Sequence, residues 1–188
     1  MQNLIKEMQW LNEPKWESRE NALTVFTLPD TDYWQRTHYG FRRDNGHAFV
    51  KEVRGGVTVR CRFQFSPNAQ YDQCGVILRI DENNWFKCSA EYENASESRL
   101  GSVLTRAGYS DWATQDISSD VRRIWYEVAY KHSDIFAKYS FDGNAFKQMR
   151  IGHLDSNNSP ISAGIYGCSP LGKGFQFTAA DLTIVCDE

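Results

Sequence analysis

The chain has 188 residues, of which 41% are hydrophobic and 24% charged, and its formal net charge is −3. This length predicts one domain spanning residues 1–188, and the hydrophobic share is enough for a buried core, which excludes a disordered chain. Lysine and arginine form no dense run and no apolar run reaches transmembrane length, so we expect neither a nucleic-acid partner nor a membrane partner.

The cysteines and the N-terminal residues indicate a reducing compartment. The chain has five cysteines, an odd number, and no two of them are spaced as in a CxxC motif. Residues 1–16, MQNLIKEMQWLNEPKW, carry polar residues inside their only apolar patch, unlike a secretory leader. We therefore expect free thiols and a cytoplasmic protein.

Short alternating runs bounded by Gly, Asn, Asp, Ser and Pro predict an all-β fold, a sandwich or a barrel. Two short helices are predicted, over residues 2–11 and 30–37. The segment GYSDWAT, which contains Asp111 and Trp112, is predicted to be a loop. The predicted strands are, in chain order, 23–28, 47–53, 56–65, 73–80, 86–93, 100–106, 123–131, 135–141, 161–168 and 174–185.

Alternation assigns each central strand one buried face. The side chains predicted to point into the core are Val57, Val59, Cys61, Phe63 and Phe65 of strand 56–65, Cys74, Val76, Leu78 and Ile80 of strand 73–80, and Phe86, Cys88, Ala90 and Tyr92 of strand 86–93. The opposite faces carry glycine, aromatic and charged residues. Those faces therefore hold the candidate functional residues.

A hairpin between the predicted strands 73–80 and 86–93 places Gly75 opposite Glu91 and Arg79 opposite Lys87. If strand 56–65 pairs with strand 73–80 on the side away from 86–93, Arg62 comes to lie beside Gly75. This gives a row of Arg62, Gly75 and Glu91. Directly opposed like charges are unfavourable unless a carboxylate or an anionic ligand lies between them. The register therefore predicts a charged site around Gly75.

Four segments in this order resemble the DUF1349 family: DYWQRTHYGFRRDNGHAF, YDQCGVILRIDENNWFKCSAEYEN, SVLTRAGYSDWAT and GIYGCSPLGKGFQFTAADLTI. The resemblance covers nearly the whole chain. It implies a concanavalin A-like jelly-roll sandwich of two antiparallel sheets with a concave face, a shape often used for carbohydrate. The fungal branch of the family is named for regulation of enolase. Fold alone does not establish function.

Paired carboxylates would be needed for glycoside hydrolysis. Jelly-roll glucanases, which this fold resembles, place acids on one strand as E-x-D-x-E, whereas here Glu91-Tyr92-Glu93 lacks the middle acid. If the protein is an enzyme, Glu91 is the candidate acid or base. It would require a second carboxylate nearby, and Glu93, Asp111 and Glu127 are the candidates. We expect a solvated strand rather than a catalytic pair.

Aromatic and polar side chains near the strand ends suit a sugar, because sugar rings stack on indoles and their hydroxyls bind polar groups. Trp85 and Trp112 are predicted to stack at the rim of the concave face, and His47 could face the same surface. No His or Cys spacing indicates a metal site, and no cofactor is expected. The predicted ligand-binding residues are Arg62, Arg79, Trp85, Lys87, Glu91, Asp111, Trp112 and His47.

The leading functional hypothesis is a non-catalytic, lectin-like protein that binds a sugar, a sugar phosphate or a glycoconjugate. One alternative is a weak glycoside hydrolase-like enzyme. Another is a protein-interaction or regulatory module that contacts a metabolic enzyme of sugar metabolism. The sequence leaves these three open.

Overall fold

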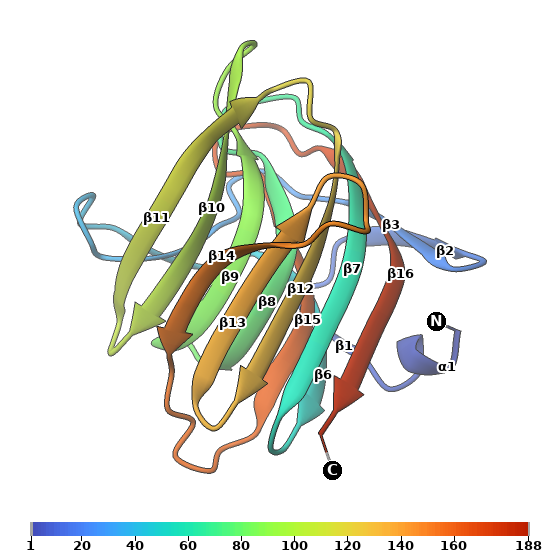
Figure 1. Cartoon of the computed structure of the whole chain (residues 1–188). Helices are drawn as coiled ribbons and strands as arrows, with labels where there is room; N and C mark the ends of the chain where they lie inside the picture. The colour runs from blue at the N-terminus through green and yellow to red at the C-terminus, as the bar shows by residue number, and fades with distance from the viewer. Residues whose placement is uncertain (1, 188) are drawn as a thin grey trace.

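Two seven-stranded antiparallel sheets face each other across one core in the computed structural model, which describes residues 2–187 (Figure 1). The first sheet has the order β1 (Gln9–Leu11), β6 (His47–Val53), β15 (Ile161–Cys168), β8 (Gln73–Asp81), β9 (Asn84–Tyr92), β10 (Glu97–Arg106), β11 (Tyr109–Ser118). The second has the order β14 (Lys147–His153), β13 (Asp134–Ser140), β12 (Arg123–Lys131), β7 (Val57–Ser66), β16 (Gln176–Cys186), β3 (Ala22–Phe26), β2 (Lys15–Arg19). This is the expected jelly-roll sandwich.

The core between the sheets follows the alternation of the sequence. The inward residues predicted for β7, β8 and β9 are buried in one cluster, except Ile80 and Tyr92, which are only half-buried near the strand ends. Each large apolar side chain removed from water contributes about 1.5–3 kcal/mol, so this shared face holds the sheets together. Within residues 2–187, no helix has the length and apolar character needed to span a membrane.

Both helix predictions are largely wrong. The first segment forms only the short helix α1 (Gln2–Ile5) and then joins the first sheet as β1. The second segment contains β4 (Tyr33–Gln35), which pairs with β5 (Arg42–Asp44) as a small hairpin. Positive φ angles at Asp30, Arg36 and His38 are incompatible with a helix there.

None of the four edge strands of the two large sheets was predicted: besides β1 and β2, these are β11 and β14. The segment around Trp112 is not a loop but β11, a ten-residue strand at one edge of the first sheet. The strand β14 lies at an edge of the second sheet. Most residues of both strands are exposed or half-buried, so neither shows the alternation that reveals a strand.

The β8–β9 register differs by two residues from the predicted one. Glu91 lies opposite Gln73 instead of Gly75, and Arg79 lies opposite Trp85 instead of Lys87. The strands pair up to Asp81 and Asn84, so the turn is tighter than the predicted loop 81–85, and a ladder irregularity lies between Arg79 and Asp81. A shift of two keeps every side chain on its predicted face, which is why the buried face was still assigned correctly.

Candidate functional site

Residues 27–46, which we call the covering segment, cross the outer face of the first sheet between β3 and β6. Tyr33 and Trp34 of this segment pack on the sheet and make a second apolar cluster outside the main core. The sheet offers an apolar surface for them, formed by Ala48, Val50, Ile77, Trp85, Val103, Tyr166 and Cys168. Much of the outer face is therefore buried by the protein itself.

Polar contacts fasten the covering segment to the strand ends. Arg79 donates two hydrogen bonds to the carboxylate of Asp44, at 2.7 and 2.9 Å. At the opposite end of the β4–β5 hairpin, the Gln35 N–H donates to Ser110 Oγ at 2.9 Å and Arg36 donates to the Gly108 carbonyl at 2.8 Å. These bonds set the position of the hairpin over the sheet.

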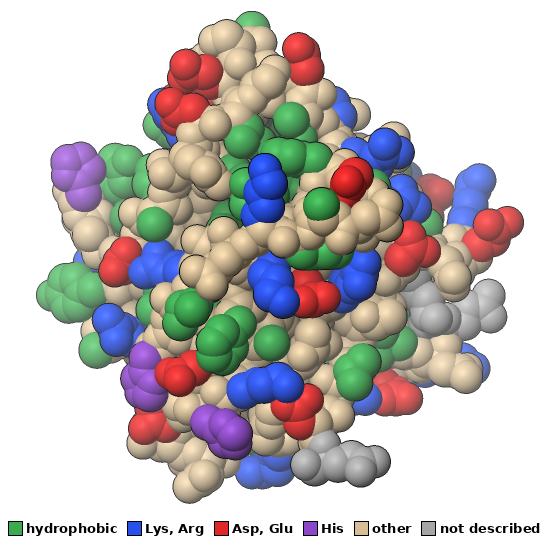
Figure 2. All heavy atoms as spheres, viewed as in Figure 1, with side chains coloured by type: hydrophobic (Ala, Val, Ile, Leu, Met, Phe, Trp, Pro, Cys, Tyr) green, Lys and Arg blue, Asp and Glu red, His purple; other side chains and the backbone are tan. Residues whose placement is uncertain are grey.

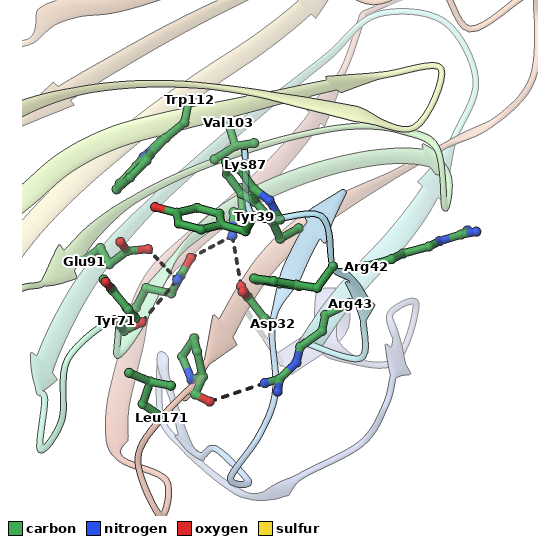
Figure 3. A pocket seen from close by; sticks show the side chains of 14 residues that line it. Asp32, Tyr39, Arg42, Arg43, Tyr71, Lys87, Glu91, Val103, Trp112 and Leu171 are labelled. Atoms are coloured by element: carbon green, nitrogen blue, oxygen red, sulfur yellow. Dashed lines mark hydrogen bonds and ion pairs between the residues drawn. The ribbon is translucent and has the colours of Figure 1, made fainter. Parts of the chain in front are cut away.

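A pocket of about 360 Å³ remains where the covering segment does not meet the sheet (Figure 3). Its floor is formed by residues of β8 to β11, and its walls by the covering segment and by the turns around residues 71 and 170. Five aromatic side chains line it: Trp34, Tyr39, Phe41, Tyr71 and Trp112. An aromatic wall around a polar floor is a common arrangement in small-molecule sites.

The floor carries a continuous polar network. Lys87 is only 3% exposed, and its Nζ lies 3.5 Å from Asp32 Oδ1. The same amine donates to Gln73 Oε1 at 2.9 Å, and the Tyr166 hydroxyl donates to that oxygen at 3.0 Å. Gln73 Nε2 in turn donates to Glu91 Oε2 at 2.6 Å. The buried lysine is therefore both paired and hydrogen-bonded, as a buried charge must be.

Glu91 is held in a form that suits hydrogen-bond donation. Burial raises the pKa of Glu91 from its ordinary 4.5 to about 8. The positive charge of Lys87 acts in the opposite direction and lowers this pKa. The carboxylates of Asp32 and Glu93 raise the pKa further. At neutral pH the group is therefore largely protonated, with Oε2 accepting from Gln73. Its other oxygen, Oε1, receives no hydrogen bond from residues 2–187, and Glu91 lines the pocket.

Trp112 lies close against the sheet because Gly101, its diagonal neighbour on β10, has no side chain. A Cβ atom added at Gly101 would lie 2.9 Å from Trp112 Nε1 and 3.0 Å from Thr114 Cγ2. The indole also meets Trp34 edge to face, with ring centroids 6.3 Å apart. Gly101 and Trp34 thus fix the orientation of an aromatic surface that is 37% exposed.

Three of the residues singled out in the sequence, Lys87, Glu91 and Trp112, come together in this pocket. Trp85 does not lie at a rim: it is fully buried, with its ring centroid 6.0 Å from that of Tyr33. Arg79 does not oppose Lys87, because the register places it opposite Trp85, and its guanidinium binds Asp44 of the covering segment. The burial of Trp85 and the Arg79–Asp44 contact both depend on residues 27–46 covering the sheet, which no local pattern predicts.

Arg62 is not on the pocket face at all. Its strand, β7, pairs with β12 and β16 in the second sheet instead of with β8. Arg62 Nε lies 3.2 Å from Asp181 Oδ2, on the outside of the sandwich. Figure 2 shows positive and negative side chains interspersed over this side of the molecule, as expected for a solvated sheet. The predicted row through Gly75 is therefore wrong.

Asp111 and His47 also lie outside the pocket. Asp111 points to the opposite side of β11 from Trp112 and pairs with Arg150 at 3.2 Å. His47 is fully buried: the Leu28 N–H donates to Nε2 at 2.9 Å, and Nδ1 lies 2.6 Å from the Asn12 carbonyl oxygen. This imidazole joins two chain segments and has a structural role.

Several pocket residues escaped the sequence reasoning. Asp32 and Tyr39 come from the covering segment, part of which reads as a helix, and no local pattern brings them to the sheet. Gln73 was assigned to the correct face by alternation, but its role as the link between Lys87 and Glu91 depends on the register. Only the long-range packing of residues 27–46 creates this constellation.

Comparison with known proteins gives one family over nearly the whole chain. The sequence model of the family described as "Protein of unknown function (DUF1349)" matches residues 10–185. The chain is 31% identical to Regulation of enolase protein 1 of Saccharomyces cerevisiae over 181 residues. The matched region covers 96% of this chain and 90% of the yeast protein. A Saccharomyces cerevisiae structure described as functionally unknown superposes with a TM-score of 0.90 and 29% identity, over 98% of both chains.

Larger proteins contain a similar sandwich. The GH43 BlXynB protein of Bacillus licheniformis superposes with a TM-score of 0.75 at 17% identity, over 96% of this chain and 37% of that one. A xylan β-1,4-xylosidase of Bacillus halodurans does so with a TM-score of 0.70 at 10% identity, over 95% of this chain and 38% of that one. At these identities the similarity extends to the fold alone.

Proposed function

The chain belongs to the DUF1349 family, and from this premise we propose that it is a carbohydrate-binding protein whose pocket on the first sheet holds the sugar. The observation that carries the proposal is the pairing of Trp112, a partly exposed indole, with the polar floor of Lys87, Gln73 and Glu91. Sugars present apolar C–H faces and hydroxyls together. The aromatic walls would contact the C–H faces, and the polar floor would bind the hydroxyls.

The charge of the floor supports a neutral or weakly acidic sugar. Lys87 is already paired with Asp32, and Glu91 is largely protonated at neutral pH. The protonated Glu91 can donate to or accept from a hydroxyl. Gln73 positions it, because the Gln73 amide is fully used by Lys87, Tyr166, Glu91 and the Tyr71 carbonyl. Arg43, which also lines the pocket, donates to the Pro170 carbonyl at 3.3 Å and would be the cation nearest to an acidic substituent.

Titration calorimetry with a panel of neutral, acidic and phosphorylated sugars tests the proposal. We expect binding that Trp112→Ala and Phe41→Ala each weaken at least about tenfold. Phe141→Ala is a matched control, because Phe141 follows β13 in the second sheet and is 42% exposed, like Phe41. Absence of binding across the panel, or equal losses in the control, would contradict the proposal.

A glycosidase function is the second candidate, favoured by the presence of two carboxyl groups, Asp32 and Glu91, in one pocket. The raised pKa of Glu91 suits a general acid, and Asp32 beside Lys87 suits the ionised partner. The three candidate partners for Glu91, which are Glu93, Asp111 and Glu127, do not line the pocket. Release of reducing ends from oligosaccharides, abolished in Glu91→Gln, would favour hydrolysis over binding.

A regulatory role is the third candidate, and it comes from the name of the 31% identical yeast relative. Such a role requires a protein partner, for which enolase is the first to test. Pull-down of purified enolase by this chain, lost in a covering-segment variant such as Tyr39→Ala, would support it. Sugar binding without enolase binding would exclude it.

A further inference from the structure

We propose that the pocket takes one terminal sugar unit of a linear glycan and excludes internal stretches of the chain. The inference rests on the proposed carbohydrate-binding function and narrows its ligand class. It follows from the shape of the pocket, which is closed on three sides and open on the fourth. A binding groove for an internal stretch needs two open ends, because the glycan must enter and leave.

The covering segment closes the side toward β15 and β6. There Tyr33 packs on Tyr166 and Trp85, with ring centroids 6.2 and 6.0 Å apart, and the sheet beneath them is fully buried. A glycan cannot continue across the sheet in this direction without displacing the second apolar cluster.

The two ends along the strands are also closed. At the end marked by the 82–83 and 107–108 turns, Gln35 and Arg36 are bonded to the carbonyls of Glu82 and Gly108. At the other end, Arg43 donates to the Pro170 carbonyl at 3.3 Å, which links the covering segment to the turn after β15 (Figure 3). Tyr71 lines the same end.

The register of the first sheet shows where the open side lies. A row of small or short side chains crosses four strands, from Thr114 through Gly101 and Ser89 to Gly75, and meets Tyr166 on β15. Thr114 is exposed, whereas Tyr166 is fully buried. The row therefore begins at the free edge of β11 and ends blind at Tyr166. A glycan that extends from the pocket over β10 and β11 would run along the indole of Trp112, which lies against Gly101.

The chemistry of the closed end suits a terminal unit. A terminal sugar has one more free hydroxyl than an internal unit, and a buried hydroxyl without a hydrogen-bond partner is costly. Lys87 and Glu91 each keep hydrogen-bonding capacity for such a hydroxyl, and Gln73 holds both in place. The volume of about 360 Å³ lies at the lower end of the range of about 300–1,000 Å³ for ligand sites.

A length series tests this inference by calorimetry. The probes are mono- to hexasaccharides of the β-1,4-glucose, β-1,4-xylose and β-1,4-mannose series, with the corresponding polymers at equal concentrations of sugar residues. We expect affinity per chain to change less than about threefold beyond the trisaccharide, because later units lie outside the pocket. Polymer binding per sugar residue should fall in proportion to chain length, since only ends are bound.

Three outcomes are distinguishable. A plateau with weak polymer binding supports the terminal-unit inference. Affinity that keeps rising with length, or polymers that bind as well per residue as the trisaccharide, would overturn the inference and leave carbohydrate binding intact. Absence of binding in this series and in the wider sugar panel would overturn both. Thr114→Ala should weaken trisaccharide but not monosaccharide binding, whereas Thr178→Ala on the second sheet should change neither.

Discussion

Arg79 holds Asp44 through two parallel hydrogen bonds of 2.7 and 2.9 Å, and this contact joins β5 of the covering segment to β8 of the first sheet. Both side chains are largely shielded from water, with exposures of 15% and 25%. Paired geometry of this kind gives a stronger and more directional bond than a surface ion pair. The pocket exists only while the covering segment stays in this position.

Replacing Arg79 by lysine should loosen the covering segment without unfolding the sheets. Lysine keeps the charge but loses the planar fork that binds both oxygens of Asp44. We expect amide hydrogen exchange across residues 33–44 to accelerate about tenfold, corresponding to about 1.4 kcal/mol. Arg62→Lys, at the exposed pair with Asp181, serves as the control. Equal acceleration throughout both sheets would contradict a local role for Arg79.

Removing the amine of Lys87 should be strongly destabilising. Lys87→Met leaves Asp32 buried without its cation, a change that typically costs about 3–5 kcal/mol. The double variant with Asp32→Asn should recover much of that loss, since the unpaired charge is gone. Urea unfolding measures each free energy, and Arg60→Met at an exposed pair should cost less than about 1 kcal/mol. No recovery in the double variant would contradict the pairing.

The alternation of single strands was enough to predict the core but not the site. Strands β7, β8 and β9 present the expected inward residues, and even a register error of two left Glu91 and Lys87 on the correct face. Arg62 was misplaced because strands adjacent in sequence, β7 and β8, belong to different sheets. Local patterns do not encode such crossovers.

The covering segment could not be predicted for a related reason. Tyr33 and Trp34 become buried only through contact with residues far along the chain, including Ile77 and Tyr166. Their sequence neighbours read as a short helix over 30–37 and show no alternation that would mark a segment packed on a sheet. The burial of Trp85 and the position of Asp32 both follow from this packing, so neither was accessible from the sequence.

The free energy of unfolding should fall as the pH rises between the unfolded and the folded pKa of Glu91. An acid whose pKa is raised by folding, here from 4.5 to about 8, keeps its proton in the folded chain while the unfolded chain has lost it. The unfolding free energy therefore decreases between about pH 5 and about pH 8, by about 2 kcal/mol after allowance for solvent screening. Glu91→Gln removes this titration. Parallel pH profiles for the parent protein and the variant would contradict the raised pKa.

His47 should contribute to stability only while it is neutral. Burial lowers the pKa of His47, and the Leu28 N–H requires an unprotonated Nε2. Because the unfolded chain binds this proton more readily, the contribution is lost as the pH falls below the ordinary value of 6.5. His47→Ala should cost about 2 kcal/mol at neutral pH. His153→Ala, at an exposed pair with Asp134, should cost much less, and equal costs by urea unfolding would contradict the buried role.

Gly101 should matter for Trp112 and not for the fold. In Gly101→Ala the new methyl would meet Trp112 Nε1 at 2.9 Å, and the partly exposed indole can move away. We expect changed tryptophan fluorescence and sugar affinity lowered at least about fivefold, with an unfolding free energy within about 1 kcal/mol of the parent. Gly55→Ala, at a position outside the pocket with no atom within 4 Å but a positive φ, controls for backbone effects. Unchanged affinity would show that the position of Trp112 is irrelevant.

The most direct test of the carbohydrate-binding pocket is the indole N–H region of the NMR spectrum during sugar titration. The chain has six tryptophans, which serve as internal reporters. Trp112 and Trp34 line the pocket, whereas Trp125 lies on β12 of the second sheet and Trp16 on β2. The proposed function predicts saturable shifts of Trp112 and Trp34 with Trp125 and Trp16 unmoved. Shifts confined to Trp125 or Trp16, or no saturable shift with any sugar, would contradict it.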